Sequence, residues 1–427
     1  MSQQKSGGAG RYRTPRGTND VLPEEEPYWR HVREIGERIC HRTGYRRIET
    51  PMFEDAGVFL RGVGEGTDIV EKEMYIFEDR GGDRLALRPE GTANVCRAYL
   101  EHGMQALPQP VRLFYISPVF RYDRPQAGRY RQHTQLGVEL IGDDGALADA
   151  EVIDVLSTLY DTLGLRGVTL RLNSIGDGAC RPGYITKLRS YYADKLDSVC
   201  PDCHMRFEKN PLRLLDCKEE PCQSIIAEAP MLRDHLCEAC SVHFNALQAQ
   251  LNALDIAFEL SPKLVRGFDY YSRTVFEFLP TEEGSQSSLG GGGRYDGLIE
   301  LLGGRPTPAT GFGTGIERII LNLKRQEIPV PEIAPARVYV AHLSEPAQAA
   351  ALRVAHRLRE GGVVTVVGSA GRSLKAQLRH ANGLGARHVA ILGEQELAKG
   401  EVTLRDMTDG RQRAVAEDDL LAALSGS

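Results

Sequence analysis

The spacing of apolar residues predicts a first part of the chain that combines helices with an antiparallel sheet. Over residues 24–42 apolar side chains recur at helical spacing, and Pro23 and Gly44 flank this segment as start and stop signals. Two extended apolar runs follow at 111–120 and 132–142. We predict that these runs pair as an antiparallel hairpin with a long tip that is rich in arginine.

The pattern becomes regular towards the C-terminal end. Strands and helices alternate from residue 338 to residue 424, which predicts a small α/β domain with a mostly parallel sheet. Residues 178–255 are rich in cysteine, charge and helix formers, and the strand pattern resumes after them, so we predict an inserted helical domain. Residues 311–323 are predicted to form a helix that glycines open. The predicted division is a disordered tail at 1–10, an α+β core at 11–177 and 256–326, the insertion at 178–255, a proline-rich linker at 327–336 and the α/β domain at 337–427.

Composition narrows the class of protein. The 427 residues are 41% hydrophobic and 26% charged, which is typical of a soluble protein with two or three domains. No apolar run is long enough to cross a bilayer, and the first ten residues lack the apolar core of a signal peptide, so we expect a cytoplasmic protein without a membrane partner. The net charge of −6 argues against a general polyanion binder, but residues 121–131 hold four arginines and one aspartate and could face phosphates.

Two segments carry polar groups where chemistry is expected. In 264–278 a strand pattern stands beside Arg266, whose burial is costly unless it is paired or faces an anion; a pair with Asp269 at a turn is the alternative. Arg121 ends the first strand of the hairpin, and Gln135 and Glu139 share one face of the second, which favours a pocket wall over a solvated loop.

Two further segments are weaker signals. Glu90 and Thr92 lie at a strand-to-helix junction, where they either meet a ligand or cap the helix. Residues 311–318 match neither the dinucleotide fingerprint nor a Walker phosphate loop, but Arg318 can reach the sheet from the helix that follows the glycines.

Together these segments resemble the class II aminoacyl-tRNA synthetases, and among them the histidyl-tRNA synthetase family. Residues 44–59, 120–139 and 311–318 resemble the three class II motifs, of which the first forms the dimer interface. Residues 266–271, with 292–297, resemble segments peculiar to the histidine enzymes. The C-terminal α/β domain resembles their anticodon-binding domain.

The resemblance implies that the chain is a homodimeric enzyme that uses ATP and Mg²⁺. It would activate L-histidine as the adenylate and transfer it to the 3′ end of histidine tRNA, with Arg121 and Arg266 as catalytic groups. The resemblance implies contacts to histidine from Glu90, Thr92, Arg121, Gln135, Glu139, Arg266, Tyr270, Tyr271 and Tyr295. It implies contacts to ATP from Arg121, Arg129, Arg266 and Arg318, and to the acceptor end of tRNA from Arg124 and Gln126.

Two other functions share parts of this pattern. A regulatory subunit of ATP phosphoribosyltransferase resembles the same core without charging tRNA, but such paralogues typically lack the C-terminal domain and the segment around Arg266, and this chain has both. Another class II synthetase, or a synthetase-like RNA-binding module, is the third interpretation. Glu139 together with 266–271 argues against a different amino acid.

The cysteines leave one question open. Six of the nine lie between residues 200 and 240, and the odd count without a secretion signal argues against a disulfide framework. The pairs Cys200–Cys203 and Cys237–Cys240 have the spacing of a structural zinc site. The inserted domain of the family that the chain resembles is not generally a zinc site, so a structural Zn²⁺ and a metal-free cluster both remain open.

Overall fold

The structure is a computed structural model of the chain. It describes residues 12–64, 67, 69–126, 128–281, 288–334 and 336–425, so the predicted tail at 1–10 lies outside the described residues. The chain divides into two compact units, residues 1–330 and 331–427. Among the described residues, none of the helices is both long and apolar enough to span a bilayer.

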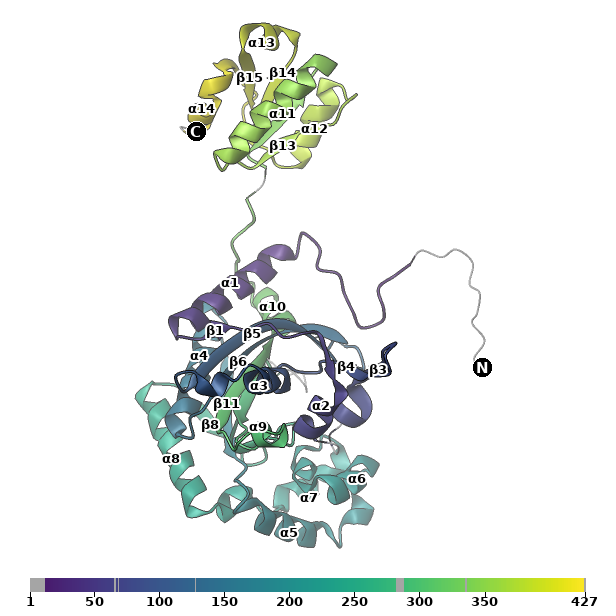
Figure 1. Cartoon of the computed structure of the whole chain (residues 1–427), viewed down its shortest axis with the longest axis vertical. Helices are drawn as coiled ribbons and strands as arrows, with labels where there is room; N and C mark the ends of the chain where they lie inside the picture. Colours follow the sequence, from purple (N-terminus) through teal and green to yellow (C-terminus); the bar gives the residue numbers. More distant parts are fainter. Residues whose placement is uncertain are drawn as a thin grey trace, which may run out of the picture. The chain divides into compact units, whose positions relative to one another are not determined.

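An eight-stranded sheet forms the centre of the first unit (Figure 1). Its order is β1 (Arg46–Arg47), β5 (Val111–Phe120), β6 (Gln132–Ile141), β11 (Ala309–Gly315), β10 (Gly290–Arg294), β9 (Ser272–Pro280), β7 (Val168–Ser174) and β8 (Phe258–Leu260). Only the outermost pairs, β1 with β5 and β7 with β8, are parallel. The predicted antiparallel core and the hairpin at 111–120 and 132–142 are therefore confirmed.

Helices on one face of this sheet bury a hydrophobic core. The helices are α1 (Glu26–Arg42), α4 (Ala146–Thr162), α8 (Glu238–Ala253) and α10 (Ile316–Arg325). On α1 the residues at helical spacing, among them Val32, Ile35 and Ile39, are buried against the sheet, as amphipathic periodicity requires. Because side chains alternate along a strand, Leu136 and Val138 of β6 belong to this core and leave Gln135 and Glu139 on the opposite face.

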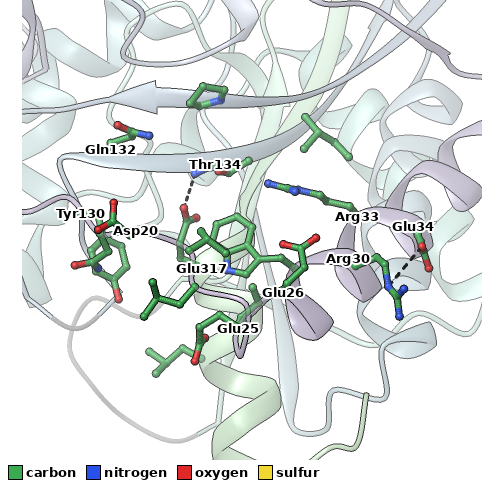
Figure 2. A pocket seen from close by; sticks show the side chains of 18 of the residues that line it. Asp20, Glu25, Glu26, Arg30, Arg33, Glu34, Tyr130, Gln132, Thr134 and Glu317 are labelled. Atoms are coloured by element: carbon green, nitrogen blue, oxygen red, sulfur yellow. Dashed lines mark hydrogen bonds and ion pairs between the residues drawn. The ribbon is translucent and has the colours of Figure 1, made fainter. Parts of the chain in front are cut away.

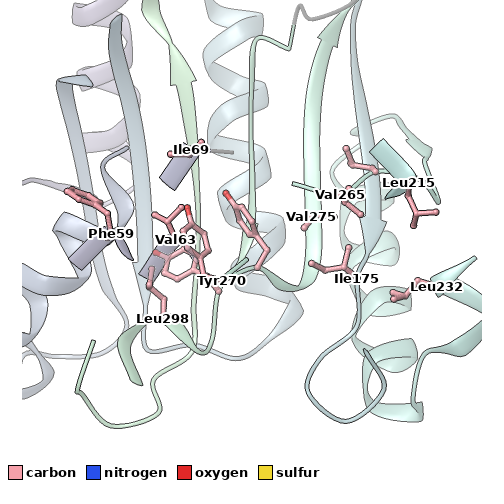
Figure 3. Packing of buried hydrophobic residues seen from close by; sticks show 14 of the residues in the cluster. Phe59, Val63, Ile69, Ile175, Leu215, Leu232, Val265, Tyr270, Val275 and Leu298 are labelled. Atoms are coloured by element: carbon pink, nitrogen blue, oxygen red, sulfur yellow. The ribbon is translucent and has the colours of Figure 1, made fainter. Parts of the chain in front are cut away.

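The opposite face carries a second core that extends into the insertion. Its helices include α2 (Ala56–Val63), α3 (Thr92–Glu101) and α9 (Leu298–Leu301), beside a small sheet of β2 (Phe53–Asp55), β4 (Arg84–Leu87) and β3 (Tyr75–Glu78). The η1 segment (Ile69–Glu73) and η2 (Met104–Ala106) complete this side. Figure 3 shows Leu215 and Leu232 of the insertion near Val265 and Ile175, in the same cluster as Phe59 and Val63 of α2.

The insertion is helical, as predicted. Its elements are α5 (Arg181–Tyr192), η3 (Leu196–Ser198), α6 (Pro201–Lys209), η4 (Pro211–Asp216), α7 (Glu220–Glu228), η5 (Leu232–His235) and α8. Tyr184, Leu188 and Tyr192 of α5 are buried at helical spacing, so this segment has an apolar core of its own that continues into that of the sheet.

The second unit is an α/β domain, as predicted. Its sheet has the order β13 (Thr365–Val367), β12 (Val338–His342), β14 (His388–Leu392), β15 (Glu401–Asp406) and β16 (Gln412–Ala416). The first three strands are parallel and the last two antiparallel. The helices are α11 (Glu345–Glu360), α12 (Leu374–Gly383), α13 (Glu394–Lys399), η6 (Glu417–Asp419) and α14 (Leu420–Ser425).

One predicted element is wrong. Residues 309–315 form the central strand β11, and only Ile316–Arg325 are helical. Glycines are required here because neighbouring groups occupy the space of a side chain: a Cβ on Gly292 would stand 1.9 Å from the carbonyl oxygen of Gly311. The two glycine-rich segments thus form β10 and β11, which are adjacent antiparallel strands of the sheet.

Candidate active site

A cavity of about 200 Å³ is lined by residues of β6, β9, β10 and β11 and by the first turn of α10. Nine of the residues predicted from the sequence line it together: Glu90, Thr92, Arg121, Arg129, Gln135, Arg266, Tyr270, Tyr271 and Arg318. They come from segments that lie far apart in the chain, so it is the fold that brings them together.

The start of α3 supplies the acidic wall. The carboxylate of Glu90 accepts hydrogen bonds from the backbone N–H groups of Thr92 (2.6 Å) and Ala93 (2.7 Å). The side chain therefore does cap the helix start, and it still lines the cavity because each carboxylate oxygen accepts more than one bond. Burial raises the pKa of Glu90, while these hydrogen bonds lower it.

Glu139 lies directly behind this wall. The carboxylate is fully buried and accepts hydrogen bonds from Thr92 Oγ1 at 2.7 Å and from the Tyr295 hydroxyl. Burial raises its pKa to about 8, and the nearby Glu90 carboxylate acts in the same direction. Neither Glu139 nor Tyr295 lines the cavity, but both reach it through Thr92.

Aromatic rings close the same end of the cavity. Phe268 and Tyr270 stack with centroids 5.1 Å apart and planes 7° apart, and Tyr270 meets Tyr295 edge to face at 5.7 Å. The centroids of Tyr270 and Tyr271 are 4.7 Å apart. Such offset and edge-to-face pairs hold the rings in fixed orientations, so this end has a rigid wall.

Arg266 lies over the glycine strand β10. Its Nη1 donates to Glu277 Oε1 at 3.0 Å, whereas Asp269 accepts a hydrogen bond from the Asn210 side chain, so the alternative Arg266–Asp269 pair is not formed. A Cβ on Gly291 would stand 2.9 Å from Arg266 Nη1. The Arg266 guanidinium thus occupies the space that a side chain at position 291 would need.

Three more arginines meet at the other end. Arg121 Nε donates to the carbonyl oxygen of Pro89 at 2.8 Å, and Arg318 donates to those of Gly128 (2.8 Å) and Ser288 (2.5 Å). Arg129 Nε pairs with Asp123 Oδ2 at 3.0 Å. Burial lowers the pKa of Arg318, and the positive charges of Arg121 and Arg129 lower it further. Like charges gathered in this way favour an anionic ligand.

Among the lining residues that were not predicted from the sequence are His133, Glu277 and Phe268. His133 alternates with Gln135 on β6, and burial together with Arg121 and Arg318 lowers its pKa to about 3. Alternation along the strand could have identified it. Glu277 and Phe268 also line the cavity. Glu277 is opposite Gly291 in the β9–β10 register, which only the strand pairing reveals.

Arg124 and Gln126, predicted to contact tRNA, lie on the loop between β5 and β6. Both side chains are exposed, and neither lines the cavity. The loop is held in place at Gln126 by a short bridge to Arg129.

The four cysteines predicted as one zinc site are divided between two groups. Cys200 and Cys203 lie with Cys217 and Cys222, whereas Cys237 and Cys240 lie with Cys180 and Asp177. The single site predicted from the spacing is therefore wrong, because the spacing of two pairs does not show which other ligands the fold adds to each.

A larger cavity of about 990 Å³ lies between the N-terminal segment, α1 and α10 (Figure 2). In it Glu317 accepts a hydrogen bond from the Thr134 backbone N–H at 2.7 Å, and burial raises the pKa of Glu317 to about 7. The described lining residues of this cavity include none of those predicted for the site. Size alone therefore does not identify the cavity that holds the residues predicted for the site.

Comparisons with known proteins agree with this geometry. Residues 17–176 and 210–319 match the histidyl-tRNA synthetase family model, and residues 337–426 match the anticodon binding domain. Histidine–tRNA ligases of Dehalococcoides mccartyi and Pelotomaculum thermopropionicum are 55% and 48% identical to the chain over 97% and 96% of it, covering 99% and 96% of their own lengths. The crystal structure of apo histidyl-tRNA synthetase from S. aureus is 34% identical, with a TM-score of 0.81 over 97% of this chain and 100% of that one. The chain therefore belongs to the histidyl-tRNA synthetase family.

Proposed function

We propose that the chain is a histidine–tRNA ligase that forms histidyl-adenylate from L-histidine and ATP and then charges histidine tRNA. The observation that carries the proposal is one cavity with two chemically different ends, a buried acid–hydroxyl cluster and a group of arginines. Relatives named histidine–tRNA ligase that match nearly the whole chain support it.

The acidic end would bind the amino acid. Glu90, Thr92 and Gln135 offer oxygen acceptors for the α-ammonium group. Glu139 and Tyr271 would bind the two imidazole nitrogens, with Tyr270 and Tyr295 as the wall. Glu139 and Tyr295 lie behind the residues that line the cavity, so the imidazole would reach Glu139 past Thr92. An imidazole needs an acceptor for its N–H, and Glu139 is the carboxylate that Thr92 and Tyr295 already orient.

The arginine end would bind ATP. Arg121 would hold the α-phosphate and the histidine carboxylate, and Arg266 would stabilise the charge that builds on the phosphate oxygens. Arg129 and Arg318 would bind the outer phosphates. The histidine carboxylate is already ionised, so it attacks the α-phosphorus without a general base while pyrophosphate leaves. Catalysis then consists of positioning and charge stabilisation.

Mg²⁺ would neutralise charge on the outer phosphates when it is bound. Mg²⁺ prefers oxygen ligands and often takes only one or two carboxylates beside substrate phosphates. The cavity fits this ligand set because Asp123 and Glu277 line it.

The tRNA would contact both units. Arg124 and Gln126 are exposed on the loop beside the cavity, where they would meet the acceptor end. The α/β domain at 337–427 would bind the anticodon, as the match to the anticodon binding domain supports. Residues 44–59 would form the interface of a cytoplasmic homodimer.

The proposed domain boundaries are those predicted from the sequence. They are the core at 11–177 and 256–326, the insertion at 178–255 and the linker at 327–336.

The regulatory paralogue is less well supported. The chain matches the anticodon binding domain, and the four arginines predicted to contact ATP all line the cavity. A direct test is to charge purified histidine tRNA with radiolabelled histidine in the presence of ATP and Mg²⁺. We expect label on the 3′ end of the tRNA. Tight histidine binding without any charging would contradict the proposal and would favour the paralogue.

A further inference from the structure

Four cysteine thiols converge inside the insertion. Cys200 immediately precedes α6, Cys203 lies in its first turn, Cys217 follows η4, and Cys222 lies in α7. Their sulfur atoms all lie within 4.8 Å of one another. Three separate elements thus deliver four metal-binding atoms to one point.

The distances fit a tetrahedral metal ion. A Zn–S bond of about 2.3 Å in a tetrahedron places sulfur atoms about 3.8 Å apart. Cys200 and Cys217 are 3.7 Å apart at sulfur, and Cys203 and Cys222 are 3.8 Å apart. The Cys200 backbone N–H also points at Cys222 Sγ at 3.3 Å, as outer hydrogen bonds to metal-bound thiolates do.

The group is closed to solvent. The four residues are between 1% and 9% exposed, and all four are free thiols. A site with four protein ligands and no open position is structural rather than catalytic. We propose that Cys200, Cys203, Cys217 and Cys222 bind one structural Zn²⁺ ion.

The metal would fix η4 against the wall of the active site. η4 lies between Cys203 and Cys217, and Asn210, immediately before it, donates a hydrogen bond to Asp269. Leu215 of η4 packs in the same cluster as Val265 (Figure 3). Zinc therefore ties the insertion to the segment that contains Arg266, Tyr270 and Tyr271. This consequence for activity rests on the proposed function, but metal binding does not.

The second group is chemically different and provides a control. Cys180 and Cys240 are 3.8 Å apart at sulfur, but the fourth group is Asp177. That carboxylate already accepts a hydrogen bond from the Ala179 backbone N–H at 3.0 Å and pairs with Arg273 at 3.3 Å. We assign no metal to this group.

The test is the metal content of the full-length protein purified without added metal. The wild type is expected to contain at least one equivalent of zinc by mass spectrometry of the digested protein. Cys203→Ser and Cys222→Ser should each contain one equivalent less than the wild type. Cys40→Ser, at a buried thiol of α1 outside both groups, should lose nothing. The double variant Cys237→Ser/Cys240→Ser should keep the equivalent of zinc that Cys222→Ser loses.

A second measurement does not depend on the folding of variants. Zn²⁺ binding to thiols releases their protons, and replacement by Co²⁺ gives the absorption bands of a tetrahedral tetrathiolate site. We expect these bands in wild-type protein refolded with Co²⁺ and their loss on addition of one equivalent of Zn²⁺. Wild-type protein without zinc and without these bands would overturn the proposal. So would unchanged zinc in Cys222→Ser, or a native mass that shows the four thiols joined in disulfides.

Discussion

The two ends of the active-site cavity use opposite ways of holding buried charge. At the arginine end, Arg121 and Arg318 donate to backbone carbonyl oxygens, which are neutral, so the positive charge remains available to a ligand. At the acidic end, Glu139 accepts bonds from two hydroxyl groups in a fully buried position. Burial has the larger effect there and raises the pKa of Glu139 to about 8. The side chain is therefore mostly protonated and neutral until a bound ligand favours its ionised form.

This difference explains how one cavity can select two substrates. A cluster of guanidinium groups, of which Arg121 and Arg318 donate to neutral carbonyl oxygens, attracts any polyphosphate, and its proposed role is to stabilise charge during the reaction. The Glu139 carboxyl group, which Thr92 and Tyr295 orient, is more selective. Only a ligand that places an N–H group against it stabilises its ionised form. The comparison therefore predicts that changes at the arginine end lower the rate and that changes at the acidic end lower histidine affinity.

The largest effect is expected from Arg266→Ala. Removing a group that stabilises transition-state charge should lower the rate of histidine-dependent ATP–pyrophosphate exchange by roughly two to three orders of magnitude. The matched control is Arg171→Ala, which removes a solvent-exposed arginine that pairs with Glu259 at 3.6 Å on the same sheet. Near-normal exchange by Arg266→Ala would remove Arg266 from the catalytic role.

Glu139→Gln should act mainly on histidine. The amide keeps the shape of the side chain but cannot provide a charged acceptor, so we expect kcat/KM for histidine to fall by about tenfold to a hundredfold. The KM for ATP should change little. Glu259→Gln, at the exposed pair with Arg171, is the control. A rise in the KM for ATP as large as that for histidine would contradict the separation of the two ends.

The proton on Glu139 should make histidine binding depend on pH. With a pKa of about 8, the free protein holds this proton at neutral pH, whereas the imidazole of histidine is already neutral there. Binding would then release the proton, so the affinity should rise by up to about fivefold between pH 7 and pH 8, and deprotonation of the α-ammonium group of histidine should oppose any further rise at higher pH. Calorimetry in two buffers of different ionisation enthalpy measures the release, and Glu139→Gln should abolish it.

The smallest effect is expected from Arg124→Ala. The side chain is exposed and lies outside the cavity, so pyrophosphate exchange should not change. Loss of one phosphate contact should lower the rate of tRNA charging by about threefold to tenfold, and less at high salt. Equal losses in exchange and in charging would show instead that Arg124 acts on the cavity through its loop.

Much of this arrangement follows from local sequence. The hairpin at 111–120 and 132–142 and the alternating C-terminal unit were predicted because the periodicity of apolar residues directly reports which face is buried. Gln135 and Glu139 were placed on one face for the same reason. His133 lies two residues before Gln135 and therefore on the same face of the strand, so the same alternation could have predicted it as well.

Other features depend on contacts between distant segments. Residues 311–315 were predicted as a helix start because glycine carries no periodic signal, yet they belong to strand β11, in which the missing side chains make room for functional groups. A Cβ on Gly311 would stand 2.2 Å from Glu139 Oε2, and one on Gly313 would stand 1.9 Å from Gln135 Nε2. The grouping of the cysteines likewise required the fold, because Cys217 and Cys180 come from different parts of it.

The most direct test of the account is ATP–pyrophosphate exchange measured with each of the twenty amino acids in turn. The account predicts exchange with histidine alone, because the arginine end needs a carboxylate nucleophile that the acidic end has selected. Exchange with a different amino acid, or with none, would contradict it.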